Sequence, residues 1–175
     1  MQTKYTISGQ GPAVLFLHGL PTSARLWDFV LPQLTQEFKC VVVDLPGAGQ
    51  SPPFADGSLD PERYAQELEE VRSRLDIPCW HIVGHDAGSV IAIHYAARHP
   101  QRVQRLVLCS PPLFPDHPIP GFFRTMRAPG LGDMIAPLLV GWPLPVGIQS
   151  AIRRNDPGLP ESVKAFCERY RGVRG

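Results

Sequence analysis

The sequence predicts an α/β fold, in which helices cover both faces of a mostly parallel sheet to give a three-layer sandwich. Short apolar runs alternate with longer stretches of helical periodicity, which is typical of parallel strands joined by crossover helices. The runs are apolar throughout, so we expect strands buried on both faces. With 175 residues, 43% of them hydrophobic, the chain is long enough to bury one core without disulfides or metal. The predicted strands are residues 13–17, 41–43, 80–83 and 106–108.

A further short strand and a first helix are predicted from local signals. Tyr5-Thr6-Ile7 is the trace of a strand before the first apolar run. Asp60-Pro61-Glu62 begins a helix, since Asp is a favoured N-cap, Pro suits the first helical position and Glu favours the positive end of the helix dipole. The residues that then form one apolar face are Tyr64, Leu68, Val71 and Leu75.

A second helix is predicted from Ser89 to His99, a segment that is apolar nearly all round. The small residues Gly88, Ala92 and Ala96 form a row that would let this helix lie close to the sheet. Pro100 ends the helix, because proline cannot continue the hydrogen-bonding pattern.

The chain changes character after residue 110, because eleven of its 20 prolines fall between Pro111 and Pro160. Strand signals stop there, and short apolar pieces separated by Pro and Gly favour broken helices. We therefore predict an α/β core over residues 1–110 and a proline-rich linker with a partial helical cap over residues 111–175.

Composition excludes several classes of function. Seventeen basic residues against 16 acidic ones leave no basic footprint for nucleic acid, and no run approaches the roughly 20 apolar residues of a membrane span. The N-terminus lacks the apolar stretch of a signal peptide. The four cysteines lie far apart with no C-x-x-C spacing, so we expect reduced thiols and no metal site. We also expect no cofactor. Reduced thiols without a signal peptide favour a cytoplasmic location.

The most informative segment is Gly84-His85-Asp86-Ala87-Gly88-Ser89, which stands between a predicted strand and a predicted helix. It has the shape of the nucleophile elbow, G-x-Nu-x-G, in which small neighbours permit a strained turn that exposes the central side chain. Asp86 occupies the central position. The alternative interpretation is a glycine-rich turn in which Asp86 only caps the helix.

Two further motifs stand at strand ends. His18-Gly19-Leu20-Pro21 follows the first apolar run, and the stretch from Asp44 to Ser51 follows the second. With the three motifs in this order, the chain resembles the α/β-hydrolase superfamily, and in particular its branch of epoxide hydrolases and haloalkane dehalogenases. The stretch from Pro21 to Trp27 is similar to the same branch.

The resemblance implies roles for five residues. Asp86 would be the nucleophile, the backbone N–H groups of Leu20 and Ala87 would form the oxyanion hole, and His18 and Gly19 would belong to the oxyanion loop. An ionised carboxylate attacks a saturated carbon well. Its attack on an acyl carbonyl would form a mixed anhydride that is no more stable than the ester consumed, so Asp86 favours an alkyl-enzyme ester. The interpretation of Asp44 is a carboxylate that fixes a loop.

The side chains at two of these positions bear on the substrate, which we expect to be a small, largely apolar organic molecule. Dehalogenases of this branch commonly have Asn and Trp where this chain has Leu20 and Ala87, so halide would lose charge-assisted hydrogen bonds of roughly 1.5–3 kcal/mol each. Epoxide is therefore favoured over alkyl halide. Tyr170 is a candidate donor to the epoxide oxygen, with an ordinary helix residue as the alternative.

The resemblance also implies an acid and a general-base histidine after strands that follow the cap, and this chain supplies neither, so the predicted fold is incomplete. We expect an open sheet edge that would permit self-association or pairing with a complementing chain. Two other functions stay open: a hydrolase of esters or C–C bonds, and a catalytically incomplete fragment that acts as a pairing module.

Overall fold

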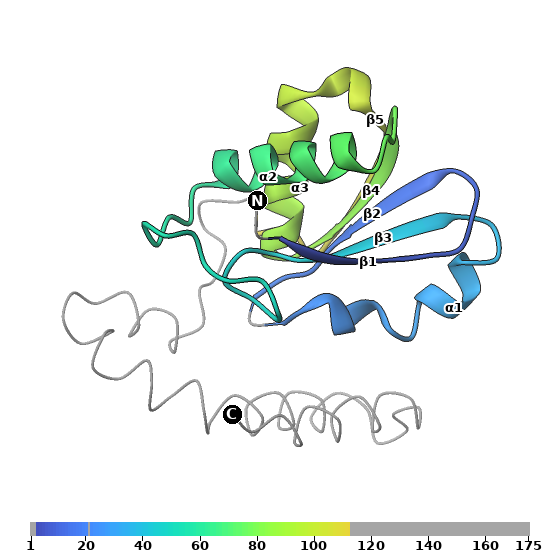
Figure 1. The fold of residues 1–175 in the computed structure, drawn as a ribbon, viewed down its shortest axis with the longest axis horizontal. Coiled ribbons are helices and arrows are strands. Elements are labelled where there is room, and N and C mark those ends of the chain that lie inside the picture. The colour runs from blue at the N-terminus through green and yellow to red at the C-terminus, as the bar shows by residue number, and fades with distance from the viewer. Residues whose placement is uncertain (1–2, 21, 113–175) are drawn as a thin grey trace. The chain divides into compact units, whose positions relative to one another are not determined.

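The computed structural model describes residues 3–20 and 22–112, which form a five-stranded sheet with helices on both faces (Figure 1). The strand order is β1-β3-β2-β4-β5. β1 pairs antiparallel with β3, and every other pairing is parallel, so the predicted mostly parallel sheet is confirmed. The strands are β1 (Lys4–Ser8), β2 (Ala13–Leu17), β3 (Lys39–Asp44), β4 (Trp80–His85) and β5 (Val103–Cys109).

Each predicted apolar run lies within a strand, and Tyr5-Thr6-Ile7 lies within β1. The central strands β2 and β3 are buried on both faces, as the unbroken apolar runs predicted: Leu15, Phe16, Val41 and Val42 are all inaccessible to solvent or nearly so. Hydrophobic burial on both faces therefore holds the centre of the sheet.

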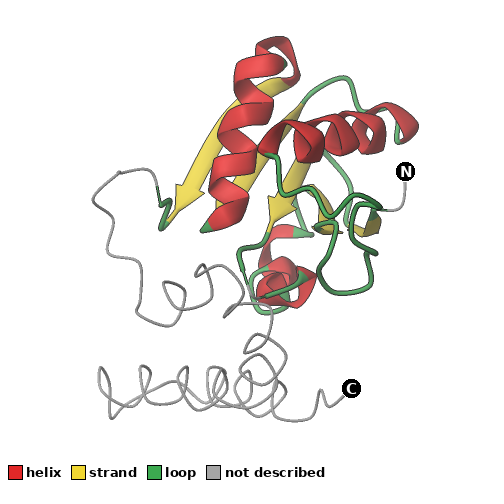
Figure 2. Ribbon diagram, turned by 90° about the vertical axis from the view of Figure 1, so that its left-hand side faces the viewer, coloured by secondary structure: helices red, strands yellow, loops and turns green. Residues whose placement is uncertain are grey.

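Helices form the two outer layers (Figure 2). α2 and α3 lie on one face of the sheet, while η1 and α1 lie on the other (Figure 1). The three-layer sandwich predicted from the sequence is confirmed. The helices are η1 (Ala24–Trp27), α1 (Leu31–Leu34), α2 (Pro61–Arg74), α3 (Ala87–Arg98) and η2 (Pro100–Arg102).

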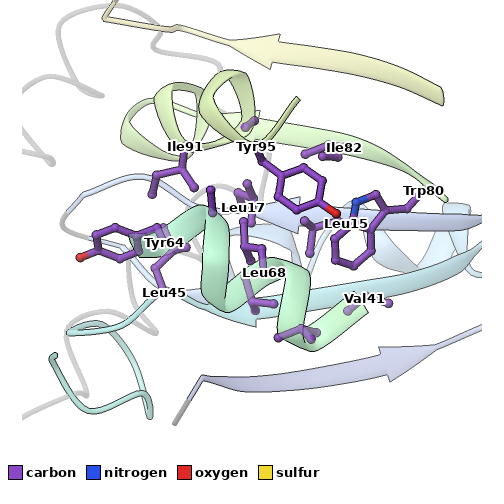
Figure 3. Packing of buried hydrophobic residues seen from close by; sticks show 14 of the residues in the cluster. Leu15, Leu17, Val41, Leu45, Tyr64, Leu68, Trp80, Ile82, Ile91 and Tyr95 are labelled. Carbon is purple, nitrogen blue, oxygen red and sulfur yellow. The ribbon is translucent and has the colours of Figure 1, made fainter. Parts of the chain in front are cut away.

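The larger core lies between the sheet and the pair α2 and α3 (Figure 3). In α2, Tyr64, Leu68 and Val71 are buried and Leu75 packs against the cluster, so the predicted apolar face is confirmed. The Asp60 side chain accepts a hydrogen bond from the Glu62 N–H at 3.0 Å, which is the expected N-cap contact. The smaller core on the opposite face is built around Phe16 and Trp27, whose ring centroids lie 5.2 Å apart.

The described residues lie in the first of two units of the chain, Met1–Pro115. The predicted partial cap falls almost wholly outside the described residues, as does Tyr170. Within the described part, β5 pairs with β4 alone, and Val107 on β5 is half exposed. Pairing of this edge with a second chain stays a prediction. No helix in residues 3–20 and 22–112 is long and apolar enough to cross a membrane.

A carboxylate links α2 to α3. Glu69 of α2 accepts hydrogen bonds from Arg72 Nε at 2.8 Å and Nη2 at 2.6 Å, and from the Tyr95 hydroxyl of α3 at 2.6 Å. Arg72 also donates to the Ile77 carbonyl beyond the end of α2. The hydrogen bond from Arg72, helped by that from Tyr95, lowers the pKa of Glu69 to about 2 against the opposing effect of burial.

Replacing this carboxylate should destabilise the fold in a pH-dependent way. The depressed pKa of Glu69 means that its stabilisation is complete above its ordinary pKa of 4.5 and is lost as pH falls toward about 2. We expect Glu69→Gln to lower the free energy of unfolding at pH 7 by roughly 1.5–3 kcal/mol. Urea denaturation of both proteins between pH 7 and pH 2.5 should show this difference shrinking with acid, with exposed Glu70→Gln as the control. A difference that stayed constant over this range would contradict the assignment.

Candidate active site

Asp86 occupies the sharp turn between the end of β4 and the start of α3. Its backbone has φ +50° and ψ −120°, a sparsely populated conformation for a residue with a side chain that costs about 1–3 kcal/mol. Its side chain makes no capping hydrogen bond to α3. Asp86 stands at the N-cap position of α3, but the interpretation that its side chain caps the helix is wrong, and the turn presents the carboxylate elsewhere.

Three glycines permit the close approach of segments around this turn. A β-carbon on Gly88 would lie 2.5 Å from the His18 carbonyl oxygen and 2.6 Å from that of Leu17. A β-carbon on Gly84 would lie 2.8 Å from the Gly88 carbonyl oxygen, and one on Gly19 would lie 2.7 Å from Asp86 Oδ2. Only residues without a β-carbon fit these positions, so the backbone of α3 lies directly against the strand ends.

The carboxylate of Asp86 meets the loop that follows β2. The Leu20 N–H donates to Asp86 Oδ2 at 3.0 Å. Ala87 is the first residue of α3, so its N–H is one of those that a helix leaves without an intrahelical partner. The structure therefore brings Leu20, Asp86 and Ala87 together in one place. Leu20 is 57% exposed.

His18 holds the loop from beneath. It is fully buried, and its Nε2 accepts a hydrogen bond from the Leu45 N–H at 3.0 Å. Nδ1 therefore carries the proton and donates to the Gly19 carbonyl oxygen at 2.8 Å. Burial is the main cause that lowers the pKa of His18, so the ring is neutral at pH 7. With both ring nitrogens engaged, His18 positions the loop and has no nitrogen left for proton transfer.

Two other side chains fix the neighbouring loops. Asp44 accepts hydrogen bonds from the Ala24 N–H at 2.8 Å and from the Gln50 N–H at 2.9 Å, in keeping with its interpretation as a loop-fixing carboxylate. The Thr22 hydroxyl donates to the Gly19 carbonyl oxygen at 2.7 Å. Sequence reasoning assigned Thr22 no role, and its only signal is its place within the motif-like stretch from Pro21 to Trp27.

His85 directly precedes Asp86 and is the last residue of β4. Its Nδ1 is buried, and within the described residues this atom has no hydrogen-bond partner. A β-carbon on Gly19 would lie 3.0 Å from it, so His85 lines the same tight space as Asp86 Oδ2. Tyr170 lies outside the described residues, and its role stays a prediction.

Comparison with known proteins points to one family. The family profile described as "alpha/beta hydrolase fold" matches residues 12–139. A haloalkane dehalogenase of Mesorhizobium japonicum is 36% identical over 135 residues, which are 71% of this chain and 43% of that protein. A pimeloyl-[acyl-carrier protein] methyl ester esterase of Nitrosomonas europaea is 39% identical over 108 residues, covering 61% of this chain and 40% of the esterase.

A solved structure gives the same picture. A proposed ancestral haloalkane dehalogenase superposes with a TM-score of 0.70 at 31% identity, covering 82% of this chain and 54% of its own. The chain thus spans less than half the length of the two curated relatives above and about half of this solved structure.

The packing at Gly88 predicts that alanine at this position destabilises the protein, although alanine ordinarily stabilises a helix. Gly→Ala within a helix ordinarily stabilises a protein by about 0.5–1 kcal/mol. Because a β-carbon here would meet two backbone oxygens, we expect Gly88→Ala to lower the free energy of unfolding by about 1–3 kcal/mol. Guanidinium denaturation measures this, with His94→Ala on the exposed side of α3 as the control, expected within about 0.5 kcal/mol of wild type. A more stable Gly88→Ala protein would refute the close approach.

Proposed function

The chain belongs to the family of the α/β-hydrolase fold, and on this premise we propose that it is a hydrolase in which Asp86 forms an alkyl ester with its substrate. The observation that carries the proposal is the hydrogen bond of 3.0 Å from the Leu20 N–H to Asp86 Oδ2, on a residue held at φ +50°. A carboxylate held in this way has a fixed orientation before substrate arrives, which favours attack.

The first step is displacement at a saturated carbon. With Oδ2 engaged by the Leu20 N–H, Oδ1 is the oxygen that attacks. The Oδ1–carbon bond forms as the bond from carbon to the leaving group breaks, and the leaving group takes the electron pair. In an epoxide the leaving oxygen stays attached to the substrate and must gain a proton, whereas an alkyl halide releases a halide ion.

The second step is hydrolysis of the ester. Water attacks Cγ of Asp86 and loses a proton, and negative charge develops on Oδ2, the former carbonyl oxygen of the ester. When this intermediate collapses, the Cγ–Oδ1 bond breaks, so Oδ1 leaves with the substrate and takes up a proton to give an alcohol. The oxygen of water completes the new carboxylate of Asp86. The N–H groups of Leu20 and Ala87 would stabilise that charge, because preorganised donors act most strongly on an oxygen that becomes negative. His18 does not serve as the base that activates this water, because both of its ring nitrogens are engaged.

Epoxide is the substrate that the side chains favour. Leu20 and Ala87 carry no side-chain N–H group that could hold a departing halide. Leu20 is apolar and largely exposed, and its N–H contacts the carboxylate, which supports a small, largely apolar substrate. The matching haloalkane dehalogenase favours alkyl halide as the second candidate, and the matching esterase keeps ester hydrolysis as an outcome that the experiments must separate.

The proposal predicts a covalent adduct on one residue. When the 175-residue chain is incubated with styrene oxide, we expect one equivalent of adduct, which peptide mass spectrometry should locate on Asp86. Asp86→Asn should lose the adduct, because a neutral amide is a poor nucleophile, while keeping its unfolding midpoint. A folded protein that neither carries the adduct nor converts styrene oxide to its diol, or hydrolysis of an aryl ester that survives Asp86→Ala, would overturn the proposal.

The preference between substrates is tested at the two neighbouring positions. We expect wild type to be alkylated by styrene oxide at least about tenfold faster than by 1-bromobutane. The double variant Leu20→Asn with Ala87→Trp should lower this ratio of rates, because its two new side-chain N–H groups can hold the departing bromide. The rates come from intact-protein mass spectrometry against time. An alkyl bromide that reacts faster than the epoxide with wild type would reverse the preferred substrate and leave the nucleophile unchanged.

A further inference from the structure

We propose that Ser89 is a positioning residue that holds Asp86 in its strained conformation and so fixes the reacting carboxylate against the Leu20 N–H. The inference rests on the proposed function of Asp86 for its kinetic consequence, but its structural part stands on geometry alone. Ser89 is fully buried in the first turn of α3, three residues beyond Asp86. It contacts no reacting atom, so it would act only through Asp86.

The Ser89 hydroxyl connects α3 to two strands. Its Oγ donates to the Gly84 carbonyl oxygen at 2.8 Å and lies 3.3 Å from the Cys109 carbonyl oxygen. Gly84 lies near the carboxyl end of β4, and Cys109 is the last residue of β5. One hydroxyl therefore ties the start of the helix to the ends of two neighbouring strands.

Cys109 and Ser89 also bind the backbone N–H and the backbone carbonyl of Asp86. The Asp86 N–H donates to the Cys109 carbonyl oxygen at 2.9 Å, and the Ser89 N–H donates to the Asp86 carbonyl oxygen at 2.9 Å. Asp86 is thus held at both of its backbone polar groups, by Cys109 and by Ser89, while the Ser89 hydroxyl fixes the start of the helix to Gly84. A strained backbone persists only where its surroundings over-determine it, and these hydrogen bonds supply that determination at φ +50°.

Serine suits this position for two reasons. A β-carbon on Gly84 would lie 2.8 Å from the Ser89 Cα, so helix and strand are too close for a large side chain at residue 89. Alanine would fit the space but would leave the Gly84 carbonyl oxygen without its hydroxyl donor. Loss of the donor would let the turn relax and would move the carboxylate relative to Leu20.

The first test reads the geometry without chemistry. The Leu20 amide resonance of ¹⁵N-labelled protein reports its hydrogen bond to Asp86, and we expect it to shift upfield in Asp86→Asn and in Ser89→Ala. Ser89→Thr keeps the hydroxyl and should shift it less. The matched control is Tyr95→Phe, which removes another buried hydroxyl from α3 at its bond to Glu69 and should leave Leu20 unchanged.

The second test reads the reaction. For alkylation of Asp86 by styrene oxide, we expect Ser89→Ala to lower the limiting rate constant about tenfold or more at an unchanged half-saturating concentration. Ser89→Thr should recover most of the rate, and Tyr95→Phe should stay within about twofold of wild type. If Ser89→Ala fails to fold, Ser89→Cys takes its place, because the thiol fills the position of the hydroxyl but is a weaker hydrogen-bond donor. We expect Ser89→Cys to lower the rate constant as Ser89→Ala would.

The outcomes separate the two proposals. If Ser89→Ala, or Ser89→Cys in its place, loses stability as Tyr95→Phe does while the Leu20 resonance and the alkylation rate stay unchanged, Ser89 is a structural residue and the inference is wrong. If no variant and no wild-type protein forms the adduct or converts styrene oxide to its diol while the Leu20 resonance shifts as expected, the proposed function of Asp86 fails and the positioning role of Ser89 stands.

Discussion

The close packing of backbone against backbone at the start of α3 is the constraint on which the rest of the site depends. Gly88 lies directly on the carbonyl oxygens of Leu17 and His18, and Gly84 lies against the first turn of the helix. At this separation the chain can pass from β4 into α3 only through a sharp turn, and Asp86 takes the strained backbone conformation at its centre. Burial of α3 against the sheet and α2 offsets that strain, because hydrophobic packing is the dominant stabilising contribution in such a core.

The carboxylate of Asp86 contacts a backbone N–H dipole, that of Leu20. Burial keeps His18 neutral, and its two hydrogen bonds hold the loop that carries the Leu20 N–H. The charged hydrogen-bonding partners of α3 are found further along the helix, where Tyr95 contacts Glu69. Asp86 is thus oriented by a backbone N–H on a loop that the neutral His18 ring holds in place, and such an arrangement needs little reorganisation when charge develops.

Most of the fold could be predicted from the sequence because its signals are local. Unbroken apolar runs revealed the buried strands, and Asp60-Pro61-Glu62 with its spaced apolar residues revealed α2. The four-residue helices η1 and α1 were not predicted, since segments this short depend on tertiary contacts, such as that of Trp27 with Phe16. At the site, motifs pointed to Asp86 and the loop at His18, but the Leu45 N–H and Ser89 act through contacts between distant segments that no local pattern encodes. The Thr22 contact is local, but its sequence signal was only the stretch from Pro21 to Trp27.

In the proposed reaction, the turn presents one oxygen of Asp86, Oδ1, to the substrate. A crystal structure of the chain after reaction with an epoxide distinguishes the two oxygens. We expect electron density for a bond between a substrate carbon and Asp86 Oδ1, with Oδ2 still accepting from the Leu20 N–H. Density that joins the substrate to Oδ2, or to another side chain, would contradict it.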